Sequence, residues 1–405
     1  MRVLVLDGNE NHAVAATRAL ARAGYRVVVG SADAWSKAGW SRYAAASFTY
    51  ASPDSDPVAF VQRLVQELRE NGPAVVMPMT ETSTIPVSMH RDEIAAAGGM
   101  TVLAPHDVLL RVFDKNAMTE LAKSLGIAVP RTWIVDDGTA VPALMRELPY
   151  PVVLKPNVSQ QRSADGGSAP TGAPAYAKSE QEFVIALADL RTRCSSVLVQ
   201  EFVTGVGAGY FALMRHGEVR GEFAHRRIRD VRPTGSGSAL RESVTPTATM
   251  RDASLKLLHA IGWHGVAMVE YRLRSDGTPV FLEINGRFWN SLALAVYAGV
   301  DFPTGAARLA EFGEVEPLAA GRAGVRTRWL LGDLRHLFSV WRGAPRGYPV
   351  AFPSRLATTF AVLVPSFGTT HDNFELLDPL PEIGDFLHFF GRKIPRALRK
   401  RGGTG

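Results

Sequence analysis

The chain has 405 residues, of which 46% are hydrophobic, and its formal net charge at pH 7 is +6. A chain of this length and apolar content can hold two or three globular domains, which excludes disorder as its main state. The surplus charge is local: residues 391–405 carry six of the 45 cations and no acid, and the other 39 cations balance 39 acids. A basic face spread over a folded domain, as nucleic-acid binding requires, is therefore not expected.

A single cysteine and the lack of a long apolar run limit the location and the chemistry of the chain. Cys194 has no second cysteine to pair with, which excludes an internal disulfide and a cysteine-based zinc site. No apolar stretch is long enough to cross a bilayer, and the N-terminus lacks the basic region and cleavage site of a signal peptide. We therefore expect a cytoplasmic protein.

The first hundred residues predict a parallel, doubly wound sheet. Residues 2–7 and 25–30 indicate strands on either side of an Ala-rich helix over 13–23. The turn before this helix lacks the spaced glycines of a dinucleotide fingerprint, so a nicotinamide or flavin site is not expected. The pattern continues with a helix over 57–71 and strands over 74–79 and 100–105. We expect a first domain over 1–105.

The next two hundred residues mix helices and strands. Helices are expected at 108–125, 141–148, 180–190 and 252–261, strands at 132–135, 151–156 and 196–203, a glycine-rich turn at 205–209 and a hairpin at His216-Gly217. Residues 157–178 are rich in Gly, Ser, Ala and Pro and are too polar for a core element. We expect a long loop there, and a loop of this length inside a compact domain is functional or disordered.

Two acidic segments predict a metal site on a β-hairpin. The segments GVAMVEYRL (265–273) and VFLEINGRFWNSL (280–292) each place an acid among apolar residues, and the SDG between them predicts the turn. Glu270 and Glu283 then become cross-strand neighbours, and Asn285 faces the same side as Glu283. Three oxygen donors on one face suit Mg²⁺. The alternative is an ordinary hairpin with solvated or salt-bridged acids, which agrees less well with so apolar a strand.

Two cations near these segments are candidates to bind phosphate. Lys155 ends the apolar strand PVVLKP, where an ammonium group is unfavourable unless it meets an anion. The alternative is a lysine that extends its charged end to solvent. Arg287 lies two residues beyond Asn285, so its guanidinium could bind a transferring phosphate through two N–H groups.

A run of basic residues, His225, Arg226, Arg227 and Arg229, precedes a Thr-, Gly- and Ser-rich segment over 232–243. A loop of this composition suits a carboxylate or an acyl phosphate, with Arg241 as the candidate to hold the acid. The alternative is a solvated basic edge. Two more residues, His12 and Glu81, follow strands of the first domain, where ligands of open α/β sheets bind. The candidate substrate residues are His12, Glu81, His225, Arg226, Arg229 and Ser236.

The C-terminal quarter is less regular. A helix is expected at 304–312, an aromatic-rich stretch covers 329–343, and no architecture is predicted for 345–405. We expect an extension over 311–405 that ends in a basic tail. In this tail Phe389, Phe390, Ile394 and Leu398 fall at near-helical spacing beside the cations, although Pro395 would interrupt a helix. The tail could contact an anionic membrane surface or an acidic partner weakly, and a solvated basic end is the alternative.

The candidate residues occur in an order that resembles the ATP-grasp superfamily of carboxylate-amine ligases. The order is Lys115 in FDKNAMTELAKSLGI, Lys155 in PVVLKP, the small-residue loop, VLVQEFVTG around Glu201, and then Glu270, Glu283, Asn285 and Arg287. The resemblance covers roughly residues 1–310. It implies an α/β protein with an N-terminal half-Rossmann domain ahead of a two-lobed, α+β nucleotide-clamping domain. This second domain would span 106–310, with a lid lobe over 130–203 and a larger lobe over 204–310.

The resemblance also implies roles for individual residues. Lys115 and Lys155 would contact the phosphates of ATP, and Mg²⁺ or Mn²⁺ would bind to Glu270, Glu283 and Asn285. The loop over 157–178 would close as a lid, with Gly166 and Gly167 allowing close approach to phosphate. The adenine would bind at Gln200, Glu201, Phe202 and Val203.

The implied reaction joins a small-molecule carboxylate to an amine. The acid would attack the γ-phosphate of ATP to give an acyl phosphate and ADP, and the amine would then displace phosphate. The predicted catalytic residues are Lys155, Arg241 and Arg287. Two alternatives are open: carboxylation through carboxyphosphate, and a regulatory protein that binds nucleotide without turnover. No nucleic-acid partner is expected, and a homo-oligomer is open.

Overall fold

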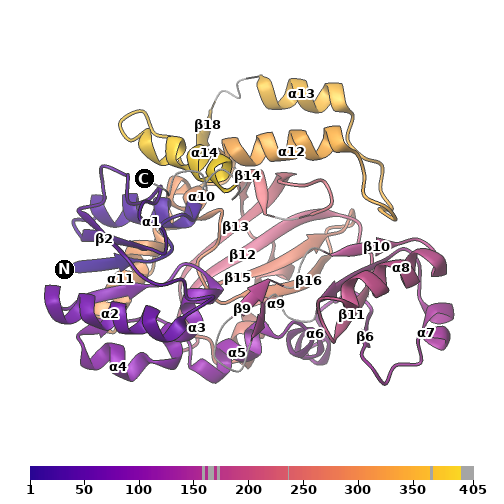
Figure 1. The fold of residues 1–405 in the computed structure, drawn as a ribbon, viewed down its shortest axis with the longest axis horizontal. Coiled ribbons are helices and arrows are strands. Elements are labelled where there is room, and N and C mark those ends of the chain that lie inside the picture. Colours follow the sequence, from indigo (N-terminus) through magenta and orange to yellow (C-terminus); the bar gives the residue numbers. More distant parts are fainter. Residues whose placement is uncertain (157–159, 163–167, 171–173, 236, 365–367, 394–405) are drawn as a thin grey trace, which may run out of the picture.

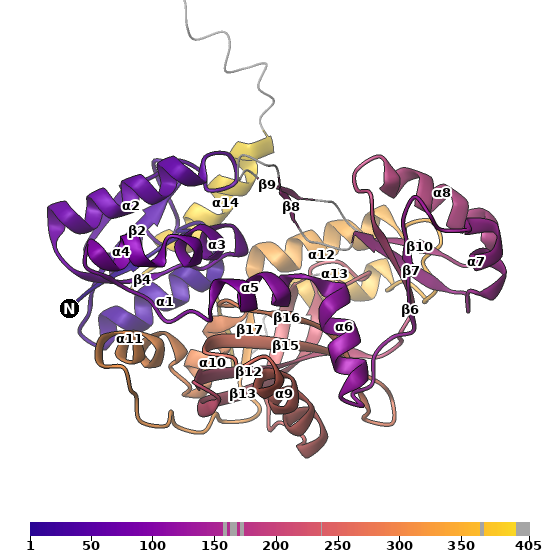
Figure 2. The ribbon, with the colours of Figure 1, turned by 90° about the horizontal axis from the view of Figure 1, so that it is seen from below.

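The computed structural model describes residues 1–156, 160–162, 168–170, 174–235, 237–364 and 368–393. Three larger sheets organise this part of the chain, together with a small two-stranded sheet. Figure 1 shows the N-terminal domain at one end of the molecule, a small lobe at the other end and the largest sheet between them. The view from below in Figure 2 shows the same order. The predicted α/β architecture is confirmed.

The N-terminal domain is built on a parallel sheet with the strand order β3-β2-β1-β4-β5. Val3, Leu4 and Val5 of β1 have no exposed surface, as expected of a strand covered on both faces. The predicted strand over 100–105 was too long: β5 has two residues, and only these pair with β4. The strands are β1 (Arg2–Val5), β2 (Arg26–Ser31), β3 (Ala46–Thr49), β4 (Ala74–Met77) and β5 (Gly99–Met100), and the helices are α1 (Asn11–Arg22), α2 (Pro57–Asn71), α3 (Glu81–Met89) and α4 (Arg91–Ala96).

The helix predicted over 108–125 is two helices, α5 (His106–Phe113) and α6 (Lys115–Ser124). Asp114 separates them because its carboxylate caps the second helix, accepting hydrogen bonds from the backbone N–H groups of Asn116 (2.9 Å) and Ala117 (3.0 Å). The cap places Lys115 in the first turn of α6, and this helix packs against β16 (Pro279–Asn285). The break in the helix therefore positions one of the predicted phosphate ligands.

The small lobe has an antiparallel sheet with the order β10-β7-β11-β6. Its strands are β6 (Thr132–Val135), β7 (Val152–Pro156), β10 (Ala175–Ala177) and β11 (Val197–Glu201), and its helices are α7 (Val141–Glu147) and α8 (Glu180–Arg191). The single loop predicted over 157–178 was wrong in part, because this segment contains β10 and the antiparallel pair β8 (Gln160–Arg162) and β9 (Ser168–Pro170). Gly166 and Gly167 lie outside the described residues.

The largest sheet has seven strands in the order β16-β15-β12-β13-β14-β17-β18. Two predictions fail here: residues 206–209 belong to a strand rather than a turn, and residues 238–243 to a strand rather than a loop. The remaining strands are β12 (Val206–Arg215), β13 (Glu218–Asp230), β14 (Ser238–Val244), β15 (Gly265–Leu273), β17 (Arg326–Arg328) and β18 (Thr369–His371), and the nearby helices are α9 (Ala248–Ala260), α10 (Leu292–Ala298) and α11 (Phe302–Phe312). The predicted hairpin at His216-Gly217 joins β12 to β13.

The C-terminal region is built into the rest of the molecule. It adds β17 and β18 to the largest sheet and contributes α12 (Leu330–Arg342), α13 (Arg355–Leu363) and α14 (Leu380–Lys393). Figure 1 shows α14 beside the N-terminal domain. Three buried ion pairs anchor this region: Arg18–Asp378, Lys37–Asp385 and Arg241–Asp372. Removing one partner of such a pair typically costs about 3–5 kcal/mol. Among the described helices, none is both long and apolar enough to span a membrane.

Candidate active site

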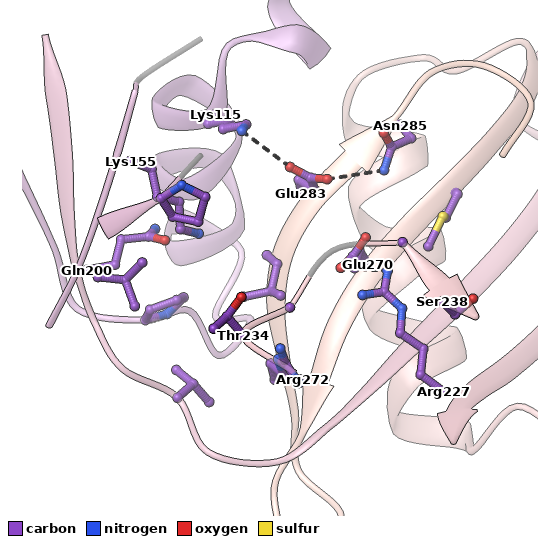
Figure 3. Close-up of a pocket in the computed structure, with 18 of the residues that line it drawn as sticks. Lys115, Lys155, Gln200, Arg227, Thr234, Ser238, Glu270, Arg272, Glu283 and Asn285 are labelled. Atoms are coloured by element: carbon purple, nitrogen blue, oxygen red, sulfur yellow. Dashed lines mark hydrogen bonds and ion pairs between the residues drawn. The ribbon is translucent and has the colours of Figure 1, made fainter. Parts of the chain in front are cut away.

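A cavity of about 500 Å³ lies between the small lobe and the largest sheet. Figure 3 shows Lys115 and Lys155 on one side of it and Glu270 and Glu283 on the hairpin that faces them. Further lining residues are Gln200, Glu201, Phe202, Val203, His225, Arg227, Arg232, Thr234, Ser238, Met268, Arg272, Asn285, Arg287, Trp289 and Ser291. Most of the residues predicted to bind metal and nucleotide therefore lie around one cavity.

The predicted acidic hairpin is present. Strands β15 and β16 pair antiparallel, and Glu270 lies directly opposite Glu283. Asn285 lies within hydrogen-bond distance of Glu283, with its Nδ2 at 3.4 Å from the carboxylate Oε1. The expectation that the two carboxylates are cross-strand neighbours is thus confirmed.

The two carboxylates have different electrostatic surroundings. Burial raises the pKa of Glu270, and its ion pair with Arg227 (2.9 Å) opposes this shift. Burial also acts on Glu283, but Lys115 at 3.6 Å, with Lys155 and Arg287, outweighs it and lowers the pKa of this carboxyl. Of the two carboxylates, Glu283 is therefore the one that stays ionised more readily.

The oxygen atoms on this wall of the cavity suit a metal ion that also binds oxygen atoms of a ligand. Among the described residues, no three Asp, Glu, His or Cys side chains converge to hold a metal ion. The chain offers two carboxylates, from Glu270 and Glu283, and one amide, from Asn285, on the same wall of the cavity. Mg²⁺ suits such a site, because it commonly takes one or two carboxylates and fills its other positions with water and phosphate oxygens.

Lys155 extends from β7 into the cavity. Burial first, and then the nearby charge of Lys115, lower its pKa to about 8. Within the described residues no carboxylate lies within ion-pair distance of its ammonium group, so among these residues the cation has no ion-pair partner and is free to bind an anionic ligand. Arg287 is held in place by hydrogen bonds to the carbonyl of Phe288 (2.7 Å) and to Oδ1 of Asn285 (3.0 Å).

Comparison with known proteins finds similar sequences and similar folds. No family model matches the chain. It is 25% identical over 263 residues to the carbamoyl phosphate synthase large chain of Methanoculleus marisnigri, an alignment that covers 60% of this chain and 24% of that protein. The chain thus spans about a quarter of the length of this relative.

Solved structures share the fold at low sequence identity. An L-amino acid ligase from Bacillus licheniformis matches with a TM-score of 0.59 and 16% identity, over 78% of this chain and 75% of that one. N5-carboxyaminoimidazole synthetase from Staphylococcus aureus, complexed with ADP, matches with a TM-score of 0.59 and 15% identity, over 78% of each chain. The chain has the ATP-grasp fold.

The end of β11 forms the wall of the cavity where adenine binding was predicted. Gln200, Glu201, Phe202 and Val203 all line the cavity. The Glu201 carboxylate is already paired with Arg131 (2.6 Å) and Arg274 (3.3 Å). The backbone N–H groups of Glu201 and Phe202 donate within the lobe, so a base would use other groups of this strand end. The nucleotide role of these four residues stays a prediction.

The basic run on β13 divides between two faces of the sheet. His225 and Arg227 line the ATP-grasp cavity, whereas Arg226 pairs with Glu242 (2.6 Å) and Arg229 pairs with Asp333. The prediction that Arg226 and Arg229 contact substrate is corrected. Arg226 points to the face opposite His225 and Arg227, because successive strand residues alternate. The strand register shifts between Arg227 and Arg229, so the alternation is interrupted and Arg229 pairs with Asp333 instead. Arg227 belongs to the predicted basic run but was not among the candidate substrate residues, although its spacing of two residues from His225 places both side chains on one face of a strand.

Arg241 does not line the cavity. It is 1% exposed, forms an ion pair with Asp372 and donates a hydrogen bond to the carbonyl of Ser238 (3.1 Å). We therefore correct the prediction that Arg241 holds the acid substrate, because its guanidinium is buried and paired with Asp372 of the same chain. Ser236 lies outside the described residues, but Thr234, Gly235 and Ser238 on either side of it line the cavity.

The predicted substrate residues of the N-terminal domain do not reach the cavity. His12 is buried and its Nε2 lies 2.7 Å from the carbonyl oxygen of Met79. Burial and the charge of Arg287 lower its pKa to about 3. Glu81 begins α3 and is not among the lining residues. Both predictions are corrected. The cavity instead includes Arg232, Arg272, Trp289, Asn290 and Ser291, which the sequence reading missed.

Proposed function

We propose that the protein is an ATP-dependent ligase that activates a carboxylate as an acyl phosphate and joins it to an amine, releasing ADP and phosphate. ATP and Mg²⁺, or Mn²⁺, are the proposed cofactors. The observation that carries the proposal is the pairing of Glu270 with Glu283 across from Lys155 in one cavity. Acids, an amide and cations thus surround a space that suits a metal-bound polyphosphate.

The residues of the cavity have separable tasks. Glu270, Glu283 and Asn285 would hold the metal ion, which neutralises phosphate charge when it is bound. Lys155, Lys115 and Arg287 would bind phosphate oxygens and orient the terminal phosphate. Arg227 pairs with Glu270 and lines the cavity together with His225, so it would present a cation to the acid substrate.

The proposed reaction has two steps. A carboxylate oxygen of the acid attacks the γ-phosphorus, and the bond from phosphorus to the ADP oxygen breaks. The amine nitrogen then attacks the acyl carbon, phosphate leaves with the former carboxylate oxygen, and the nitrogen loses a proton. These two steps require the cavity to position two anions and to neutralise their charge, and neither step forms a covalent bond between the substrate and the protein.

The names of similar proteins support two versions of this chemistry. An L-amino acid ligase favours acid-amine ligation, whereas a carboxyaminoimidazole synthetase and the carbamoyl phosphate synthase relative favour a carboxyphosphate route. A non-catalytic nucleotide-binding protein is the third possibility. It is less well supported, since a regulator has less need of a complete set of metal and phosphate ligands.

Phosphate and ADP release should be measured with Mg-ATP and a panel of acids, amines and bicarbonate. We expect release that requires one acid together with one amine. Release that requires bicarbonate and no other acid would favour the carboxylase. Binding of Mg-ATP without release for any pair would contradict the ligase proposal and favour the regulator.

We further propose small-molecule substrates, a cytoplasmic location and a weak contact of the basic C-terminal tail with anionic membrane. The exposed Leu380, Ile383 and Leu387 of α14 precede this tail, the exposed Phe390 lies at its start, and all four support the contact. Sedimentation with anionic vesicles should be lost when the chain is truncated before Phe389, and equal sedimentation of both forms would refute the contact.

A homo-oligomer is also proposed, which the concentration dependence of sedimentation velocity tests.

A further inference from the structure

An aromatic cluster joins the C-terminal region to the adenine end of the cavity. Tyr348, in the connection between α12 and α13, packs edge-on against Tyr176 of β10, with ring centroids 5.1 Å apart. It also packs against Phe202, at 5.9 Å. Tyr176 and Phe202 line the cavity. Tyr348 is not among the lining residues, but it packs against both of these rings. Figure 1 shows this connection extending from the two helices toward β10.

The two tyrosines also hold one loop of the largest sheet. The Tyr348 hydroxyl donates a hydrogen bond to the carbonyl of Pro233 (2.8 Å), and the Tyr176 hydroxyl donates to the carbonyl of Thr234 (2.6 Å). These carbonyls belong to the connection between β13 and β14, which lines the cavity at Arg232, Thr234 and Gly235. These hydrogen bonds therefore connect the small lobe and the segment over 343–353 to the connection between β13 and β14.

The backbone of the connection fits closely against β10. Gly347 has a φ of +73°, and a Cβ atom added there would lie 2.3 Å from the carbonyl oxygen of Tyr176. Any larger residue would force β10 and the connection apart. A glycine at this position is what allows Tyr348 to reach both Tyr176 and Phe202.

We propose that residues 343–353 act as a clasp that holds the small lobe and the loop over 231–235 together around bound nucleotide, with Tyr348 as its positioning residue. The proposal rests on the proposed function for the identity of the ligand. Tyr348 acts through Tyr176, Phe202 and the carbonyl of Pro233, and it does not touch the phosphates. Its loss should therefore weaken nucleotide binding and leave the chemical step in place.

Binding of Mg-ATP by calorimetry and steady-state kinetics test the clasp. Tyr348→Ala removes the ring packing and the hydrogen bond, and we expect about tenfold weaker binding and an equal rise in KM for ATP. Tyr348→Phe keeps the ring, so a loss of about threefold is expected. Gly347→Ala should resemble Tyr348→Ala, although it leaves both rings intact. In each variant kcat should change much less than KM.

A second readout separates the clasp from the ligase proposal. In protein without added ligand, Tyr348→Ala should speed hydrogen exchange of the backbone amides in 175–177 and 231–235. This result does not depend on which nucleotide the protein binds. Phe360→Ala, on the exposed face of α13, is the matched control and should change neither exchange nor binding. If the wild type does not bind Mg-ATP but Tyr348→Ala still shows faster exchange, the ligase proposal is rejected and the contacts of the clasp are not. Unchanged exchange, or binding within twofold of wild type, would reject the clasp.

Discussion

Glu283→Gln is expected to lower substrate-dependent ADP release by at least about 100-fold. Glu283 has a lowered pKa and lies opposite Glu270, so it is the carboxylate best suited to hold a cation against the phosphates. The substitution keeps the size of the side chain and removes its charge. Added Mg²⁺ should restore little activity, because the missing donor lies within the site.

Glu218→Gln serves as the control for this variant, since Glu218 is exposed on β13 away from the cavity. Both variants should keep the circular dichroism spectrum of the wild type. Turnover by Glu283→Gln within a few-fold of the wild-type rate would show that the hairpin does not bind the catalytic metal, and the assignment of Glu270 and Asn285 would fail with it.

Lys155→Ala is expected to reduce kcat/KM for ATP by about 100-fold. The pKa of Lys155 is lowered to about 8, so its ammonium group is charged below that pH and loses its proton as the pH rises. In the wild type, kcat/KM for ATP should therefore fall as the pH passes through about 8. Lys155→Arg should keep a cation above this pH and lose that dependence.

The control for Lys155 is Lys178→Ala, an exposed lysine just after β10 in the same lobe. It should show the wild-type rate and the same fall above pH 8. A wild-type kcat/KM that is flat between pH 7 and pH 9 would show that the charge of Lys155 is not needed in the free enzyme. Normal turnover by Lys155→Ala would exclude it as a phosphate ligand.

The acidic hairpin could be predicted because its information is local. An apolar strand, a turn and a second apolar strand set the pairing of Glu270 with Glu283, and two-residue spacing adds Asn285. The apolar strand PVVLKP could be read in the same way, and Lys155 of this strand, β7, lines the cavity.

The errors come from information that is not local. Arg226 and Arg227 lie on opposite faces of β13, and which of these faces is turned toward the cavity depends on how the strand packs in the folded protein. The role of Arg241 depends on Asp372, 131 residues away, and a short segment gives no sign of such a partner. Tyr348 and Tyr176 likewise meet only when the C-terminal region folds back over the small lobe.

The proposed function requires that the acidic hairpin and Lys155 together bind a metal-bound nucleotide. Titration calorimetry with a non-hydrolysable ATP analogue, with and without Mg²⁺, tests it most directly. We expect saturable binding to one site that requires Mg²⁺ and is lost in Glu283→Gln. No association in the presence of Mg²⁺, or equal affinity in the wild type and Glu283→Gln, would contradict it.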